Sequence, residues 1–185
     1  VQGFNGLYFI ALLERGQREF TYYRKGSAAT SLGTEDVDVG YIAGAGMLHL
    51  SGITQAISPS ARQATLRAAQ IARSHGVRVS YDPNLRLQLW SLAEAREALE
   101  ELLPYVDILL PSAPQETEQL VGARSPEEAI RYFWSKGIDT VAVKLGESGC
   151  MVGAEGKMAG LGAIAPRGVM DTTGAGDVFN GAFRS

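Results

Sequence analysis

The sequence predicts an α/β fold with a mainly parallel sheet flanked by helices, preceded by a separate β-hairpin. From about residue 46 onward, short apolar segments alternate with amphipathic segments that are bounded by helix-starting and helix-ending residues. Helices between apolar strands imply right-handed crossovers, and these make the strands parallel and cover both faces of the sheet. The hairpin is predicted by two runs rich in bulky residues, 7–13 and 19–24, on either side of the polar turn 14–17.

Capping residues predict where the helices between the predicted strands begin and end. Ser58 and Pro59 have the pattern of an N-cap and a first helical residue, and Gly76 follows the end of that helix. Residues 91–94 have the pattern of a capping box, which begins the next helix. The remaining predicted elements are the strands 47–50, 77–81, 106–110 and 140–145, the helices 115–121 and 126–136, and a β-rich stretch over 150–164.

Composition and charge narrow the class of protein. The 185 residues include 17 Lys and Arg against 20 Asp and Glu, so the net charge of −3 offers no basic surface for nucleic acid or for an anionic membrane. The single cysteine, Cys150, excludes a disulfide framework and a zinc site of several cysteines. No apolar run reaches the roughly 18–20 residues of a membrane-spanning helix. We therefore expect a cytoplasmic protein that acts on small molecules.

The sharpest motif lies near the carboxyl-terminal end. Residues 171–177 read Asp-Thr-Thr-Gly-Ala-Gly-Asp, and the segment 178–183 after them looks like the first turns of a helix. Small residues let backbone N–H groups approach an anion, and the amino end of a helix adds unpaired donors. Such a site suits a phosphate or the charge that develops during phosphoryl transfer. From this pattern alone, Asp177 could cap the helix or act as a general base toward a substrate hydroxyl.

The whole string 171–183 resembles the carboxyl-terminal signature of the ribokinase-like (PfkB) carbohydrate kinases, as do the order of elements and residues 143–149. The resemblance implies a ribokinase-like fold in which residues 1–30 form part of a β lid and residues 31–185 form an incomplete α/β kinase core. In that core the family's amino-terminal strand segment and carboxyl-terminal helices are missing. Further segments are similar to the 2-keto-3-deoxygluconate kinases of that family, namely 6–9, 20–28, 48–53 and 82–90.

The resemblance implies ATP-dependent phosphorylation of the 6-hydroxyl of 2-keto-3-deoxygluconate. Asp177 would be the catalytic base, and the backbone N–H groups of Gly174, Ala175 and Gly176 would form the anion hole for the transferred phosphoryl group. ATP and Mg²⁺ would be the cofactors, with a monovalent cation as a further candidate. The alternatives are another sugar kinase of the family, acting on a ketohexose, a pentose or a nucleoside, and a non-catalytic sugar-acid-binding relative.

Two arginines are the candidates for recognising the carboxylate of a sugar acid, because the guanidinium group binds a carboxylate through two parallel hydrogen bonds. The resemblance places Tyr8, Tyr22, Arg24 and Arg86 in the sugar-acid pocket. From the residues alone, the tyrosines could be ordinary strand aromatics and Arg24 a solvated charge. Alternation puts Tyr22 and Arg24 on one face of their strand, and Arg86 follows the carboxyl end of a strand, where open α/β sheets bind ligands.

Nucleotide and metal candidates also follow from the resemblance. The family's Asn-x-x-Glu motif lacks its Asn here, and Glu116, with Glu118 as the alternative, would organise Mg²⁺ through water. Either glutamate could instead complement a helix dipole, and Lys144 could be a solvated lysine. The predicted nucleotide-binding residues are Lys144, Gly146, Gly149, Thr173, Gly174 and Gly176.

The resemblance further implies that the chain is an interior part of a longer kinase. We expect the 185-residue chain alone to be weakly active or inactive, because the sheet edges and the last helix would lose their cover. A homo-oligomer formed through the β lid is compatible with the resemblance.

Overall fold

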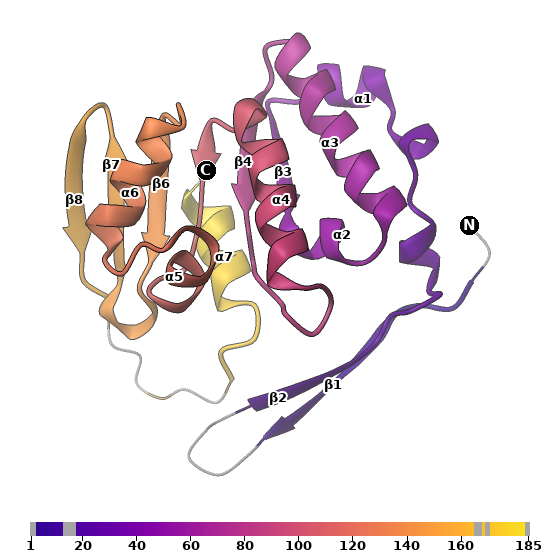
Figure 1. Cartoon of the computed structure of the whole chain (residues 1–185), viewed down its shortest axis with the longest axis horizontal. Coiled ribbons are helices and arrows are strands. Elements are labelled where there is room, and N and C mark those ends of the chain that lie inside the picture. Colours follow the sequence, from indigo (N-terminus) through magenta and orange to yellow (C-terminus); the bar gives the residue numbers. More distant parts are fainter. Residues whose placement is uncertain (1–2, 13–17, 165–167, 169–170, 184–185) are drawn as a thin grey trace.

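The computed structural model describes residues 3–12, 18–164, 168 and 171–183, which form two sheets and the helices around the larger one (Figure 1). The larger sheet has the strand order β3-β4-β5-β6-β7-β8. Strands β3 to β6 are parallel, and β7 and β8 are antiparallel to their neighbours, so the predicted mainly parallel sheet is confirmed. Its strands are β3 (Met47–Ser51), β4 (Arg78–Asp82), β5 (Ile108–Leu109), β6 (Thr140–Lys144), β7 (Cys150–Ala154) and β8 (Lys157–Leu161).

The helices begin where the capping residues predict. The Ser58 hydroxyl accepts the Ala61 N–H at 3.1 Å, and Ser91 and Glu94 make both bonds of a capping box. Two short helices within 39–56 and the 3₁₀ turns were not predicted, since elements this short carry no clear periodicity. The helices are α1 (Val39–Ala43), α2 (Gly52–Ala56), α3 (Pro59–Ser74), α4 (Leu92–Leu102), α5 (Gln115–Val121), α6 (Pro126–Ser135) and α7 (Ala175–Phe183), and the 3₁₀ turns are η2 (Ala28–Ser31), η3 (Thr34–Asp36), η4 (Leu103–Tyr105) and η5 (Gly146–Ser148).

Alternation along the strands divides the core between the two faces of the sheet. Leu109, Val141 and Val143 belong to the main apolar cluster, which includes buried residues of α3, α4 and α6. The neighbouring strand residues Ile108, Leu110 and Ala142 form a second cluster with two phenylalanines of α7. Helix α7 therefore packs on the opposite face of the sheet from α3, α4 and α6, as predicted for a sheet covered on both sides.

The smaller sheet is a two-stranded antiparallel ribbon of β1 (Leu7–Leu12) and β2 (Arg18–Tyr23) that projects from the larger body (Figure 1). The predicted hairpin is thus confirmed in its strands, and its turn, 14–17, lies outside the described residues. Tyr8 pairs with Tyr22, and both rings lie on the ribbon face that also carries Phe20. The division of the chain into a lid, 1–30, and a core, 31–185, stays a prediction.

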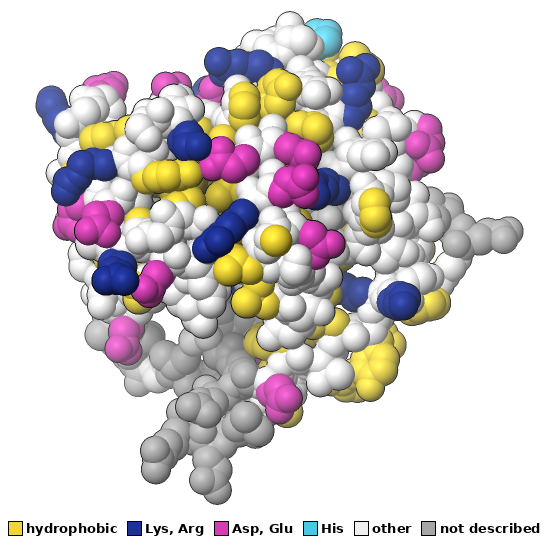
Figure 2. Space-filling view, viewed as in Figure 1, with side chains coloured by type: hydrophobic (Ala, Val, Ile, Leu, Met, Phe, Trp, Pro, Cys, Tyr) yellow, Lys and Arg dark blue, Asp and Glu magenta, His cyan; other side chains and the backbone are white. Residues whose placement is uncertain are grey.

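The surface of the helical side mixes both signs of charge. Figure 2 shows Lys and Arg side chains interspersed with Asp and Glu, without a large basic area on this face. Arg62 pairs with Glu97 and Glu101, and Lys136 pairs with Glu100 at 2.8 Å. Among the described residues, no helix has the length and apolar character needed to cross a membrane.

Candidate active site

A cavity of about 980 Å³ lies between the ribbon and the carboxyl ends of the parallel strands. This is the edge at which open α/β sheets bind ligands, because the loops that follow neighbouring parallel strands converge there. Three predicted residues, Gly146, Gly149 and Ala175, do not line the cavity. The predicted residues that it brings together are Tyr8, Tyr22, Arg24, Arg86, Glu116, Lys144, Thr173, Gly174, Gly176 and Asp177.

The segment before α7 is a tight glycine turn. The Thr173 N–H donates to the Asp171 carboxylate at 2.8 Å, and the Ala175 N–H donates to the Thr172 carbonyl oxygen at 3.1 Å. Gly174 follows with φ of +78°, a left-handed conformation that glycine adopts without steric cost. This turn directs the amino end of α7 toward the cavity.

The first turn of α7 offers backbone donors to that cavity. The Val178 N–H donates to the Gly174 carbonyl at 2.9 Å, which is the first i→i−4 bond of the helix. The amides of Gly176 and Asp177 precede this bond and so have no carbonyl partner within the helix. The exposed side chain of Asp177 stands beside them and lines the same cavity. Backbone donors at a helix end and a carboxylate therefore lie next to each other, and their predicted roles as anion hole and catalytic base stay predictions.

On the ribbon, Arg24 is held by two aromatic rings. Its guanidinium carbon lies 6.0 Å from the centre of the Tyr8 ring and 5.8 Å from that of the Tyr22 ring, within the range of cation–π attraction. The Arg24 Nε is buried and has no hydrogen-bond partner within the described part of the chain. An unpaired donor on a fixed cation is suited to an anionic ligand.

The loop after β4 carries Arg86 to the other wall. The Asp82 carboxylate accepts the Asn84 N–H at 3.0 Å, and Asn84 adopts a φ of +40°. The half-buried Arg86 donates to the Leu85 carbonyl at 2.9 Å. Asn84 was not predicted as a site residue, although an Asn directly after Asp-Pro is a recognisable signal of such a turn.

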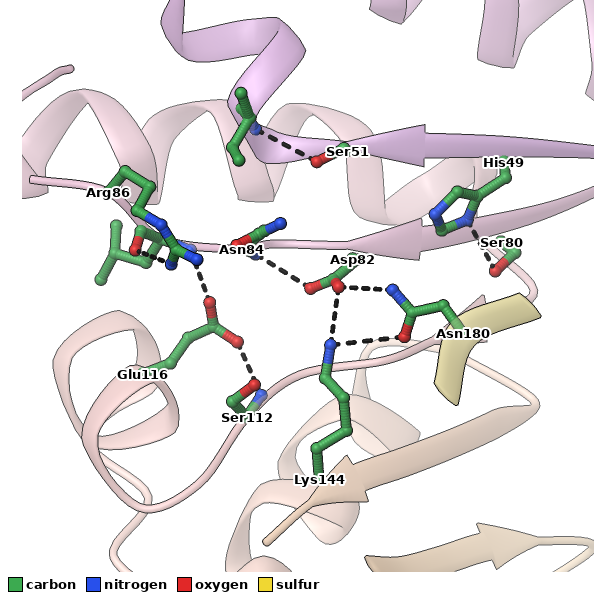
Figure 3. A network of polar contacts seen from close by, with 12 residues as sticks. His49, Ser51, Ser80, Asp82, Asn84, Arg86, Ser112, Glu116, Lys144 and Asn180 are labelled. Carbon is green, nitrogen blue, oxygen red and sulfur yellow. Dashed lines mark hydrogen bonds and ion pairs between the residues drawn. The ribbon is translucent and has the colours of Figure 1, made fainter. Parts of the chain in front are cut away.

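Glu116 fastens this loop to the segment that leads into α5. Its two carboxylate oxygens accept the N–H groups of Leu85 and Ser112, each at 2.6 Å (Figure 3). Burial, together with the nearby Asp82 carboxylate, raises the pKa of Glu116 above its ordinary value. Glu118 is exposed, lies outside the cavity and pairs with Arg124 at 3.5 Å, so Glu116 is the glutamate that belongs to the site. Its contact with Mg²⁺ through water stays a prediction.

Lys144, at the end of β6, forms an ion pair with Asp82. Its Nζ lies 2.6 Å from Asp82 Oδ2 and 3.3 Å from the Asn180 side-chain oxygen (Figure 3). Asp82 and Asn180 were not predicted as site residues, because the three side chains come from distant parts of the sequence. Lys144 still lines the cavity, and its predicted contact with the nucleotide stays a prediction.

Gly149 has a structural reason to be glycine. Its φ is +97°, and a Cβ at this position would overlap the Leu161 carbonyl oxygen of β8. Gly146 has a φ of +59° and open space around it. The nucleotide-binding role predicted for both residues stays a prediction.

A dedicated metal-binding cluster is absent from the described part of the chain. Within 3–12, 18–164 and 171–183, no three His, Cys, Asp or Glu side chains gather into a group that could hold a metal ion. Mg²⁺ typically binds through nucleotide phosphates, water and one or two carboxylates, and so needs no such group.

The fold and this cavity can now be compared with known proteins. The family model described as "pfkB family carbohydrate kinase" matches residues 2–185. The chain belongs to this family. The predicted resemblance and the ribokinase-like fold are thereby confirmed.

The relatives of this PfkB-family chain include two kinds of sugar kinase. It is 40% identical over 182 residues to a 2-dehydro-3-deoxygluconokinase of Thermoproteus tenax, covering 96% of this chain and 54% of the relative. It is 35% identical over 178 residues to a fructokinase of Solanum tuberosum, covering 95% and 52%. A putative ribokinase II of E. coli in complex with ATP and Mg²⁺ has a TM-score of 0.84 at 30% identity, covering 97% of this chain and 56% of that one. The chain spans about half the length of the curated relatives it matches.

Proposed function

We propose that this chain carries much of the active site of an ATP-dependent sugar-acid kinase that phosphorylates the 6-hydroxyl of 2-keto-3-deoxygluconate (2-dehydro-3-deoxygluconate). The observation that carries this proposal is one cavity lined by two arginines, Arg24 and Arg86, and by Asp177 beside the glycine turn. A sugar acid has a carboxylate at one end, which suits the two arginines, and a primary hydroxyl at the other end, which suits Asp177. The 40% identity to a kinase named for this substrate agrees with the assignment.

Asp177 is the proposed base. It accepts the proton of the 6-hydroxyl, whose oxygen then forms a bond to the γ-phosphorus of ATP as the bond to the leaving ADP oxygen breaks. The resemblance places the backbone donors for the transferred group at Gly174, Ala175 and Gly176. In the structure the Ala175 N–H donates to Thr172, so the donors that we assign at the helix end are those of Gly176 and its neighbour Asp177. Mg²⁺ bound with ATP would supply neutralising charge on the phosphates, with Glu116 as the proposed contact through water.

Arg24 and Arg86 are the proposed carboxylate-binding residues. The Arg24 guanidinium packs against the rings of Tyr8 and Tyr22 before a ligand binds, which reduces the side-chain entropy lost on binding. The residues Arg24 and Arg86 both line the cavity, and their guanidinium groups offer the charge-assisted hydrogen bonds that a neutral sugar does not need.

A fructokinase is the second candidate, because potato fructokinase is 35% identical to this chain. A ketohexose would use the same base and helix end but would leave the arginines without a carboxylate partner.

The test is an ADP-release assay on the full-length gene product with 2-keto-3-deoxygluconate, fructose, ribose and a nucleoside. We expect the highest kcat/KM with the sugar acid. The highest value with fructose would overturn the substrate assignment in favour of the second candidate. Binding of the sugar acid without ADP release would indicate a non-catalytic relative.

A further inference from the structure

Three buried polar side chains join three elements at the wall of the cavity. Asp82 ends β4, Lys144 ends β6, and Asn180 lies in α7. Figure 3 shows the three side chains pointing toward one another. Asp82 Oδ2 accepts from Lys144 Nζ at 2.6 Å and from Asn180 Nδ2 at 2.6 Å, and Lys144 Nζ also donates to Asn180 Oδ1 at 3.3 Å. Each of the three side chains thus contacts the other two, and we call them the Asp82–Lys144–Asn180 cluster.

Because the three side chains are buried, the charge of Lys144 interacts mainly with the other two residues of this cluster. The side chain of Asp82 is 3% exposed and that of Lys144 is 11% exposed, while Asn180 is 1% exposed. Removing one partner of a buried ion pair is strongly destabilising, because it leaves an uncompensated buried charge. Lys144 therefore acts on its surroundings mainly through Asp82 and Asn180.

The cluster touches both halves of the proposed site. Asn180 lies three residues after Asp177, about one helical turn along α7, and a Cβ at Gly176 would lie 3.8 Å from Lys144 Nζ. On the other side, Asp82 Oδ1 accepts the Asn84 N–H at 3.0 Å within the loop that carries Arg86. A shift of any side chain of this cluster would move Asp177 and the amino end of α7 relative to the loop that carries Arg86.

We propose that Lys144 is a positioning residue that, through Asp82 and Asn180, fixes the amino end of α7 against the Asp82–Arg86 loop. The expected effect on catalysis rests on the proposed function, whereas the expected effect on the structure does not. Misplacing a base by about 1 Å can cost about 100-fold in rate. Loss of the cluster should therefore lower kcat, whereas a direct nucleotide contact by Lys144 would show itself in the KM for ATP.

The kinetic test uses Lys144→Met, Asn180→Ala and the double variant in the full-length gene product, with Lys136→Met as the matched control in an exposed ion pair. We expect each single variant to lower kcat at least about tenfold with the KM for ATP within about threefold, and Lys144→Arg to recover part of the loss. The double variant should lose little more than the worse single variant, because the side chains act together. A tenfold rise in the KM for ATP at unchanged kcat, or losses that multiply, would overturn the proposal.

Hydrogen exchange gives a readout that does not depend on activity. Amides of 82–88 and 171–183 should exchange faster in Lys144→Met and Asn180→Ala than in the wild type, and at the wild-type rate in Lys136→Met. If Lys144→Met does not fold, the variant Asp82→Asn/Lys144→Met leaves no uncompensated charge and gives the same readout. Unchanged exchange in both segments would refute the positioning role, even if the wild type transfers no phosphate to any sugar.

Discussion

Asp177 is the residue on which the proposed chemistry depends most. It is exposed to the cavity in the first turn of α7, beside backbone amides that have no helical carbonyl partner. We expect Asp177→Asn to lower kcat by about 100- to 10,000-fold and to leave the KM for the sugar within a few-fold, because the amide keeps the shape but accepts no proton. Steady-state kinetics check this, with the exposed Asp139→Asn as control. Wild-type turnover in the Asp177 variant would rule out the base assignment.

The buried carboxyl group of Glu116 should make the stability of the protein depend on pH. Burial raises its pKa, so the unfolded chain releases this proton at a lower pH than the folded chain does. The contribution of Glu116 to stability is therefore fully present below the ordinary glutamate pKa of about 4.3 and is lost as the pH rises through the raised value. Glu116→Gln should remove this part of the decline. Melting temperatures measured between about pH 4 and pH 7 check it, and parallel curves for both proteins would contradict it.

At the scale of elements, the helix boundaries were the most predictable feature. The helix predicted over 115–121 is α5 with the same bounds, and the serine caps fix the starts of α3, α4 and α6. Strand β5 is shorter than the predicted 106–110, since Asp107 Oδ2 accepts the Val79 N–H at 2.7 Å where a longer ladder would begin. Helices α1 and α2, of five residues each, were beyond the reach of a periodicity argument.

A prediction at this scale concerns the start of α2. A Cβ at Gly52 would overlap the Pro83 carbonyl oxygen, within the loop that carries Arg86. We expect the added methyl group of Gly52→Ala to displace this loop and so to raise the KM for the sugar about tenfold. Overpacking should also lower the free energy of unfolding by about 1–3 kcal/mol. Gly160→Ala, where an added Cβ meets open space, is the control. Kinetics and denaturant unfolding check it, and matching KM values for the two variants would contradict it.

At the scale of the whole molecule, the site is an assembly of segments far apart in the chain. Motif and resemblance predicted Asp177, Arg24 and Arg86, and the fold places all three around one cavity. They could not reveal the Asp82–Lys144–Asn180 cluster, because its bonds span 62 and 98 residues and depend on how α7 packs against the sheet. The chain spans about half the length of the curated relatives it matches, so the activity of the whole protein stays a proposal.

We propose that phosphate is transferred within this cavity to a sugar acid, and that Arg24 and Arg86 bind the carboxylate of this sugar acid. The most direct test compares kcat/KM for 2-keto-3-deoxygluconate and for fructose in the wild type and in Arg86→Met. We predict that the wild type prefers the sugar acid and that the variant loses about 10- to 100-fold of that preference, since a charged hydrogen bond contributes about 1.5–3 kcal/mol. Equal losses on both substrates would contradict the claim.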